Sequence, residues 1–477
     1  MKSSPAHLPL YRYRFWIGFG LVAILTIALT VWNFWRLPNG LTSGEILTAS
    51  RSGGLNLGGI LRGIGDFTNL PFLILQKTSI EILGFSTLAL RLPSVILSLL
   101  SIAMLAVALV YYERKNVSVI SVFLLFTSPL FLSLARSSGA GSMTVFLLLA
   151  IILSAVLLLS GQFHSWRSAG LKLAMCLAAA LLLYSPGGLI VVAALIVIGL
   201  WHPKSRYEVF RNKRYKLLLG LLLALVVITP LAISLARQHY VLEILGINGW
   251  TVANFCASWN LWFTGNKLVG GFMTPLFNIE VVALAFYGVV RLARALSAAR
   301  ARLVLPLLLL TLLLTFGDPR LAFWLFVPIS MALATGVSGL LSAWYDLFPR
   351  NPYARTFALL AVALLVVIAG FSSVGNYFAN NFYSRPVITA LNRQFEAVRT
   401  AAADHQKHTL LVPADQLTFY RNLTRDFPKL NITSRRPLRS GSTSLLVVSD
   451  VRPPLSSVPH RLVTDFTVND AMLLREY

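Results

Sequence analysis

The chain has 477 residues, of which 56% are hydrophobic and only 12% are charged, and its mean hydropathy is +0.73. Soluble domains carry about 25% charged residues, so this composition excludes a water-soluble fold for most of the chain. The formal net charge of +24 would suggest nucleic acid as a partner of a soluble protein, but the basic residues here cluster in short loops between apolar runs. That distribution follows the positive-inside rule and indicates membrane lipids, and no nucleic acid, as their partners.

Apolar runs long enough to cross about 30 Å of hydrocarbon need about 20 residues. Arg12 and Arg14 precede the first run, which lacks a small-residue cleavage site and is therefore expected to remain as a span. Basic loops place the N-terminus in the cytoplasm. We predict an all-α polytopic membrane domain over residues 1–375 with about eleven transmembrane helices, at 15–35, 91–112, 117–135, 142–160, 170–184, 187–201, 216–236, 276–296, 303–317, 321–341 and 355–375.

Two of the predicted outer loops are long. The first, residues 36–90, contains a stretch at 69–84 that follows Asp66 and Pro71 and is typical of an amphipathic helix lying along the membrane surface, with Lys77 and Glu81 on one face. The second, residues 237–275, is rich in Trp, Phe and Tyr. Such aromatic residues usually mark the headgroup level, and they could also wall a groove for a lipid chain.

The last residues, 376–477, are more polar and predict a small α/β domain. Helices are expected at 386–403 and 414–427, and strands at 409–412, 444–448, 461–466 and 472–475. An odd number of spans places this domain on the extracytoplasmic side. It contains no Gly-rich phosphate loop, so no nucleotide site is expected. Asn422-Leu-Thr and Asn431-Ile-Thr fit the glycosylation acceptor pattern, which also arises often by chance.

Three segments together resemble a known family. They are Leu37-Pro-Asn-Gly-Leu-Thr-Ser-Gly-Glu45, Asn69-Leu-Pro-Phe72 and Leu83-Gly-Phe-Ser-Thr-Leu-Ala-Leu-Arg-Leu-Pro-Ser94. Their order and spacing are similar to those of the GT-C membrane glycosyltransferases, in the branch of protein O-mannosyltransferases and aminoarabinose transferases. The resemblance implies an enzyme of the plasma membrane that takes a sugar from a polyprenyl-phosphate carrier and transfers it to an acceptor on the outer face.

The resemblance also implies a carboxylate in the first outer loop that activates the acceptor or coordinates a divalent metal. The acidic pair of the family aligns with Gly44-Glu45, so only the second acid is present. Glu45 is the preferred general base, and its alternative role is to cap a helix or to pair with Arg51. Asp66 is the other candidate acid, and its alternative role is a helix N-cap.

The phosphate of the carrier needs positive charge on the outer side, where the guanidinium fork suits phosphate oxygens. Arg136 and Arg320 match basic positions of the family near span ends, and Arg62, Arg237 and Lys267 are further candidates. The alternative is that Arg136 and Arg320 reach the lipid headgroups. Glu280 lies near the predicted outer start of a span and is expected to pair with one of these arginines.

Two other functions stay open at this point. A transporter would usually show paired internal repeats or charged helices at the membrane midplane, and the sequence shows no convincing repeat. The missing first acid also leaves open a non-catalytic protein of GT-C type that serves in binding or assembly. No cluster of Cys and His indicates a structural metal site.

Overall fold

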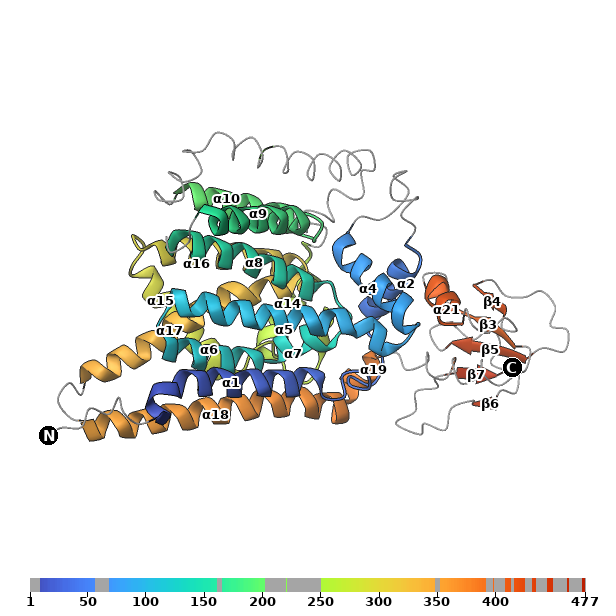
Figure 1. Ribbon diagram of the computed structural model, residues 1–477. Helices are drawn as coiled ribbons and strands as arrows, with labels where there is room; N and C mark the ends of the chain where they lie inside the picture. The colour runs from blue at the N-terminus through green and yellow to red at the C-terminus, as the bar shows by residue number, and fades with distance from the viewer. Residues whose placement is uncertain are drawn as a thin grey trace.

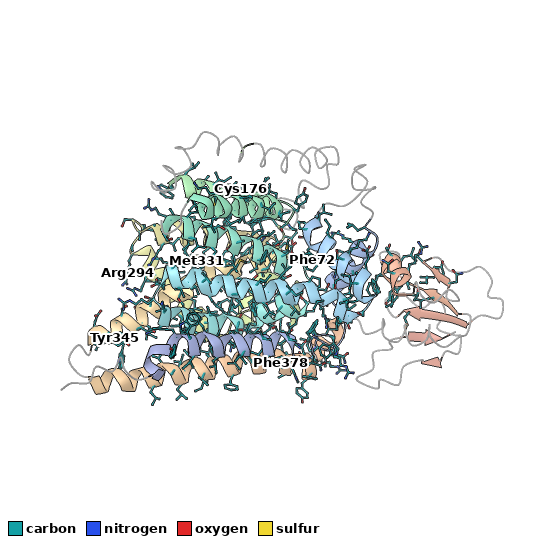
Figure 2. The ribbon with its side chains drawn as sticks, in the orientation of Figure 1. Phe72, Cys176, Arg294, Met331, Tyr345 and Phe378 are labelled. Atoms are coloured by element: carbon teal, nitrogen blue, oxygen red, sulfur yellow. The ribbon has the colours of Figure 1, made fainter. Side chains whose placement is uncertain are left out.

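The computed structural model describes residues 9–55, 68–160, 165–201, 220, 250–347 and 352–391, and in the C-terminal part residues 398, 408–412, 416–424, 431–434, 444–448, 461–462 and 474–476. Its long helices lie side by side in one bundle, and a β-sheet lies beyond one end of the bundle (Figure 1). We call this end the loop end, because α2 (Ser43–Gly53) and α4 (Leu70–Leu83) also lie there. In Figure 2, Phe72 lies toward the loop end, whereas Arg294 and Tyr345 lie at the opposite end.

Ten of the eleven predicted spans coincide with helices of the bundle. The eleventh, at 216–236, lies almost entirely outside the described residues. Five described helices are long and apolar enough to cross a membrane, and a bent pair makes up to six, so the total of eleven stays a prediction. The bundle helices are α1 (Pro9–Val31), α5 (Thr87–Tyr112), α6 (Lys115–Phe126), α7 (Pro129–Arg136), α8 (Gly141–Ser160), α9 (Ser165–Leu182), α10 (Gly188–Trp201), α15 (Ile279–Ala293), α16 (Ala299–Gly317), α17 (Phe326–Leu347) and α18 (Pro352–Tyr383).

The predicted span at 117–135 is made of two helices with a bend between them that was not expected from the sequence. Helices α6 and α7 meet at an angle of 63°. Pro129 has no backbone N–H to donate and disfavours helical backbone in the residue before it, so α6 ends and a new helix begins at the proline. The Ser128 hydroxyl caps this new helix by accepting a hydrogen bond from the N–H of Phe131 at 3.3 Å. The bend turns α7 across the bundle, with Arg136 in its last turn.

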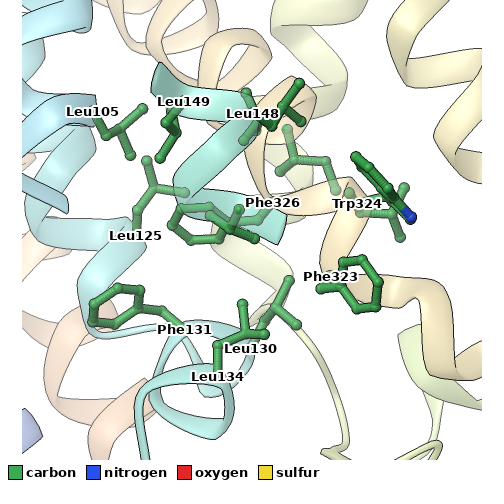
Figure 3. Close-up of a cluster of buried hydrophobic side chains, with 14 of the residues drawn as sticks. Leu105, Leu125, Leu130, Phe131, Leu134, Leu148, Leu149, Phe323, Trp324 and Phe326 are labelled. Atoms are coloured by element: carbon green, nitrogen blue, oxygen red, sulfur yellow. The ribbon is translucent and has the colours of Figure 1, made fainter. Parts of the chain in front are cut away.

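The core of the bundle is apolar and continuous between α5, α7, α8 and α17 (Figure 3). The Phe131 and Phe326 rings stack with centroids 5.9 Å apart. Trp324 is fully buried and donates its indole N–H to the Pro186 carbonyl at 3.0 Å. A buried indole N–H normally finds such an acceptor. Trp324 belongs to the 3-10 helix η2 (Pro319–Leu325), which this hydrogen bond ties to the turn between α9 and α10.

The helix predicted at 69–84 is present as α4, with the Lys77 ammonium 3.7 Å from the Glu81 carboxylate, and its place along the membrane surface stays a prediction. Its N-cap position is occupied by Asn69, which adopts a left-handed backbone with φ of 61° and makes no side-chain cap. Asp66, the expected N-cap, lies outside the described residues. The Asn69 N–H instead donates to the Tyr184 carbonyl at 2.7 Å, which ties the start of α4 to the turn between α9 and α10.

The C-terminal residues form a five-stranded mixed sheet with the order β4-β3-β5-β7-β6. The strands are β3 (His408–Leu411), β4 (Asn431–Thr433), β5 (Ser444–Val448), β6 (Arg461–Leu462) and β7 (Leu474–Glu476). Strands β4, β3 and β5 are parallel, and β7 runs antiparallel to β5 and β6. Strand β4 was not expected from the sequence. In the described residues, the helices predicted at 386–403 and 414–427 are shorter than expected and correspond to α19 (Arg385–Ala390) and α21 (Leu417–Leu423). Helix α18 ends at Tyr383, beyond the domain boundary expected at 375.

Candidate functional site

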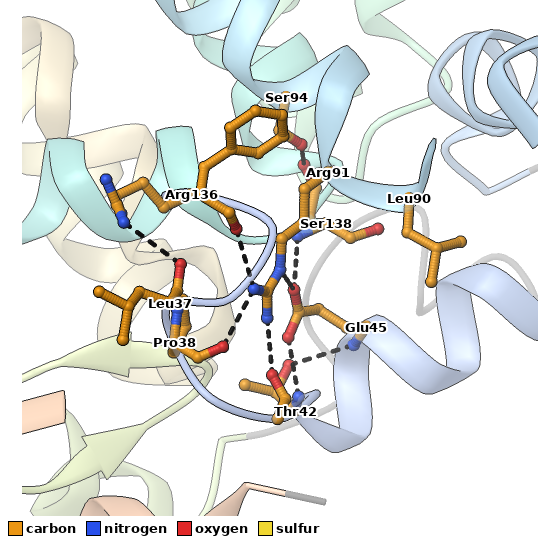
Figure 4. Close-up of polar contacts among 12 residues, drawn as sticks. Leu37, Pro38, Thr42, Glu45, Leu90, Arg91, Ser94, Arg136 and Ser138 are labelled. Carbon is orange, nitrogen blue, oxygen red and sulfur yellow. Dashed lines mark hydrogen bonds and ion pairs between the residues drawn. The ribbon is translucent and has the colours of Figure 1, made fainter. Parts of the chain in front are cut away.

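Arg91 is the central hydrogen-bond donor of the loop end (Figure 4). It lies in the second turn of α5 and is completely buried. Its Nη1 donates to the carbonyls of Phe34 and Pro38 at 3.1 and 3.0 Å, and its Nη2 donates to Gly40 at 2.6 Å. Its Nε donates to the Glu45 carboxylate at 3.1 Å. The rigid fork of arginine can serve several acceptors at once, so Arg91 shapes the loop that joins α1 to α2.

Pro93 explains how α4 is attached at the same place. A proline inside a helix cannot donate to the carbonyl four residues earlier, which here is that of Ala89. The Ser79 hydroxyl of α4 donates to this carbonyl at 2.7 Å. Gln76 of α4 donates its amide to the neighbouring Leu90 carbonyl at 3.1 Å and also contacts the Ser138 hydroxyl. The Arg-Leu-Pro-Ser segment therefore holds the loop on one side and the surface helix on the other.

Glu45 is 2% exposed, and both oxygens of its carboxylate accept hydrogen bonds. One oxygen accepts from Arg91 and from the N–H of Ser138 at 2.8 Å, and the other accepts from the N–H of Thr42 at 2.8 Å. The Thr42 hydroxyl in turn accepts from the Glu45 N–H at 3.1 Å, which completes a capping box at the start of α2. The capping role weighed from the sequence is therefore present, and the ion-pair partner is Arg91 instead of the expected Arg51.

This geometry bears on the expected base. A general base must take a proton from the molecule that receives the sugar, and the Glu45 carboxylate already accepts three hydrogen bonds. To act as the base, Glu45 would have to give up one of these hydrogen bonds and contact that molecule instead. As the loop stands, Glu45 acts as a structural acceptor that joins α2, α5 and the turn after α7.

Arg136 lies beside this network and is also fully buried. Its Nη1 donates to the Leu29 carbonyl at 2.6 Å and its Nη2 to the Leu37 carbonyl at 3.4 Å. Its guanidinium carbon lies 5.0 Å from the centre of the Phe378 ring. Among the described residues, the Nε of Arg136 has no acceptor, and a buried donor of this kind is a group that a bound anion can satisfy. Tyr377 of α18 interacts electrostatically with the same cluster.

A small hairpin that follows Lys267 packs against the backbone at the start of η2, which contains Arg320. Strands β1 (Leu268–Val269) and β2 (Phe272–Met273) form it directly after Lys267. A Cβ on Gly270 at its tip would lie 2.8 Å from the Pro319 carbonyl carbon and 2.9 Å from the Arg320 nitrogen. On its other side, the Met273 N–H donates to the Ser133 hydroxyl of α7 at 3.3 Å. Lys267 and Arg320 are both exposed, unlike Arg136.

The aromatic second loop contains α14 (Val252–Phe263), which has two distinct faces. Ser258 and Leu261 are buried, and Asn254 donates to the Gly317 carbonyl at 3.2 Å. The opposite face exposes an apolar row of side chains, namely Trp250 just before the helix, Val252, Phe255, Trp259 and Phe263. This pattern is typical of a helix that lies at the headgroup level.

Several predicted residues do not join the site in the described part of the chain. Arg62, Asp66 and Arg237 lie outside the described residues. The Glu280 carboxylate forms no ion pair with any described arginine, and one of its oxygens is buried without a hydrogen-bond partner there. Within the same residues no three Asp, Glu, His or Cys side chains gather as a metal site would require.

Sequence reasoning missed Arg91, Gln76 and Ser138 as site residues. The signal for Arg91 was present, because a charged residue next to a long apolar run is retained only where it finds partners. Its partners could not be found in this way, since Glu45 is 46 residues and the Phe34 carbonyl 57 residues away along the chain.

Comparison with known proteins gives the family context. Residues 71–233 match the family model described as dolichyl-phosphate-mannose-protein mannosyltransferase. No curated protein matches the chain in sequence. The fold is similar to that of ArnT from Cupriavidus metallidurans bound to undecaprenyl phosphate, with a TM-score of 0.53 and 11% identity over 97% of this chain and 98% of ArnT.

A second solved structure is the Archaeoglobus fulgidus oligosaccharyltransferase tethered with an acceptor peptide. Its TM-score is 0.53 and its identity 14%, over 88% of this chain, which spans 64% of the archaeal protein. At such identities the likeness shows the fold. The chain is therefore a multi-pass membrane protein that shares the fold of these two solved structures, and its segment 71–233 is similar to the mannosyltransferase family.

Proposed function

We propose that the protein transfers a sugar from a polyprenyl-phosphate carrier to an acceptor at the loop end of the bundle, which we place on the outer face of the plasma membrane. The observation that carries the proposal is the β1–β2 hairpin, which packs on α7 on one side and on η2 on the other. Arg136 lies on α7, Arg320 lies in η2 and Lys267 directly precedes the hairpin, so the hairpin links the three segments that carry these cations. The fold similarity to a protein bound to undecaprenyl phosphate supports the choice of donor.

In the proposed reaction a nucleophilic oxygen or nitrogen of the acceptor attacks the anomeric carbon of the sugar. The bond between this carbon and the phosphate oxygen breaks, and the polyprenyl phosphate leaves with the electron pair. Negative charge grows on the leaving phosphate, so positive side chains fixed nearby lower the barrier. We assign this task to Lys267 and Arg320, whose exposed charges can reach a headgroup, with Arg136 as a third cation at the buried edge.

The proton of the acceptor must pass to a base, and Glu45 and Asp66 are the proposed candidates. We propose that Glu45 acts mainly by holding the loop, because its two oxygens already accept three hydrogen bonds. Asp66 is then the acid to test first as the base. If this division holds, Asp66→Asn should remove transfer while leaving stability unchanged, whereas Glu45→Gln should lower both.

The direct test is incubation of the purified protein with labelled polyprenyl-phosphate sugars and membrane acceptors, next to a glycosyltransferase known to work under the same conditions. Transfer by the wild type supports the proposal. Absence of transfer with every donor and acceptor, while the control enzyme works, contradicts the catalytic assignment.

Removal of Lys267 or Arg320 should weaken binding of polyprenyl phosphate. We expect Lys267→Ala and Arg320→Ala each to raise the dissociation constant about tenfold, which corresponds to about 1.4 kcal/mol, because each would lose a charge-assisted hydrogen bond. The measurement is binding of a fluorescent polyprenyl phosphate in mixed micelles. Arg294→Ala is the matched control, since Arg294 is exposed at the opposite end (Figure 2). Equal effects at all three positions would show nonspecific attraction only.

A lipid-binding protein of the same fold without transfer is the second candidate. Two observations favour it, namely Gly44 in place of the first acid and the full engagement of Glu45. The two functions separate in one experiment, because a non-catalytic protein would bind polyprenyl phosphate with the dependence on Lys267 and Arg320 described above and yet transfer no sugar.

A further inference from the structure

Helix α2, which carries Glu45, has little stability of its own. It has only eleven residues, and six of them are Gly, Ser or Thr. Isolated helices shorter than about 12–15 residues are marginal in water even when they are rich in alanine. These residue types also rank below alanine in helix propensity. Contacts with the rest of the protein must therefore hold α2 in its helical form.

Two different parts of the chain hold its two ends. At the N-terminal end, the capping box and Arg91 fix Thr42 and Glu45 to the bundle. At the C-terminal end, α2 lies against helix α21 of the C-terminal domain (Figure 1), and the Leu55 carbonyl just beyond α2 accepts from the Lys77 ammonium of α4 at 2.6 Å. The Thr418 methyl group of α21 would lie 3.3 Å from a Cβ added at Gly54.

The closest approach is between Gly53 and Asn422. A Cβ added at Gly53 would lie 2.9 Å from the Asn422 Cγ and 3.5 Å from its Cβ, and the amide nitrogen would be closer still. This amide nitrogen is buried and has no acceptor among the described residues. Asn422 is therefore packed against α2, and its amide is not open to modification as the Asn422-Leu-Thr pattern would require.

An apolar cluster surrounds this contact and joins α2, α4 and the C-terminal sheet. Phe85 and Phe419 meet edge to face with ring centroids 5.4 Å apart. The cluster is separate from the core of the bundle. Its buried members are Leu41, Ile46, Ala49, Leu90, Val398, Leu410, Val412, Phe419, Tyr420 and Leu423.

We propose that α21 of the C-terminal domain is a positioning element for α2, and that the docked domain is the state in which Glu45 stays bound to Arg91. The activity part of this inference rests on the proposed transfer reaction. Asn422 and Phe419 are positioning residues, since Asn422 contacts α2 and Phe419 contacts Phe85 between α4 and α5, and they act on the site only through these neighbours. Undocking would remove α21 from the C-terminal end of α2 and leave α4 as its support there. The short helix, rich in Gly and Ser, would then unwind from Gly53 toward Glu45.

A cross-link tests the docking without reference to activity. Cysteines at Gly53→Cys and Asn422→Cys would have Cβ atoms about 3.5 Å apart, within the range for a disulfide. In a Cys256→Ser background, which removes the exposed native thiol, the pair should become inaccessible to a maleimide mass tag after mild oxidation in membranes. Gly53→Cys with Arg421→Cys is the matched control, because Arg421 is exposed on α21. Absence of a cross-link, or equal cross-linking of the control, overturns the docking.

Two activity measurements then test positioning. The cross-linked protein should transfer sugar at least as fast as the same protein after the disulfide is reduced. The proposal would be overturned if the cross-linked protein were inactive and became active only after reduction. Gly53→Leu should lower kcat at least tenfold with little change in KM for the lipid donor, and Asn422→Gly should restore part of the loss by making room. If the wild type transfers no sugar, the rate of protease cleavage within α2 is measured in place of the transfer rate. Gly53→Leu should then increase the rate of cleavage.

Discussion

Replacement of Arg91 by Ala is expected to lower the free energy of unfolding by about 3–5 kcal/mol, because it leaves the buried Glu45 carboxylate without its counter-ion. Both side chains are at most 2% exposed, so the carboxylate that remains lies away from bulk water. The carbonyls of Phe34, Pro38 and Gly40 lose their donors at the same time. The measurement is equilibrium unfolding in mixed micelles. Arg91→Lys should recover only a small part of the loss, because an ammonium cannot reproduce the planar fork.

A double-mutant cycle gives this expectation its control. Arg91→Ala combined with Glu45→Gln should be less destabilising than the sum of the two single changes, since the pair loses its charges together. The ion pair between Lys77 and Glu81 at 3.7 Å is the comparison, because the two side chains are 30% and 66% exposed. Glu81→Ala should lower stability by no more than about 1 kcal/mol. Additive effects at Arg91 and Glu45 would show that the pair does not act as a unit.

The parts of the fold that depend on local sequence were predictable. Apolar runs gave the helices of the bundle, and the stretch after Pro71 gave the surface helix, because hydrophobic length and periodicity are carried by neighbouring residues. The bend between α6 and α7 was missed, although Pro129 was visible. Hydropathy alone does not register the loss of backbone hydrogen bonds at a proline inside an apolar run.

The polar centre of the site could be predicted only in part. Glu45 was found through the order of segments in the first loop, and its capping role through the residues around it. Glu45 is bonded to Arg91 and Ser138, which follow it in the chain by 46 and 93 positions. No local sequence pattern encodes such contacts. The docking of α21 on α2 was missed for the same reason, because the closeness of Gly53 and Asn422 is a property of the folded chain.

The close packing of α15 on α17 leads to the second large effect. Gly288 and Gly336 face each other across this contact. A Cβ on Gly336 would overlap the Leu284 carbonyl oxygen and lie 2.9 Å from its carbon, and a Cβ on Gly288 would meet the backbone of Ala332 in the same way. Small residues allow helices in membranes to approach this closely, where packing and lipid entropy drive association. Both obstructing groups are backbone atoms, so neither can move aside as a flexible side chain would.

Gly336→Ala should therefore destabilise the bundle by about 3 kcal/mol or more, at the upper end of overpacking effects, and Gly336→Leu should prevent assembly. The expected readout is a lower unfolding midpoint in micelles and loss of the monodisperse peak on gel filtration. Gly375→Ala is the control, because Gly375 lies in α18 with no atom within 4 Å of an added Cβ. There the change should be neutral or stabilising, since alanine is the better helix former. A Gly336→Ala protein as stable as the Gly375→Ala protein would mean that α15 and α17 lie further apart.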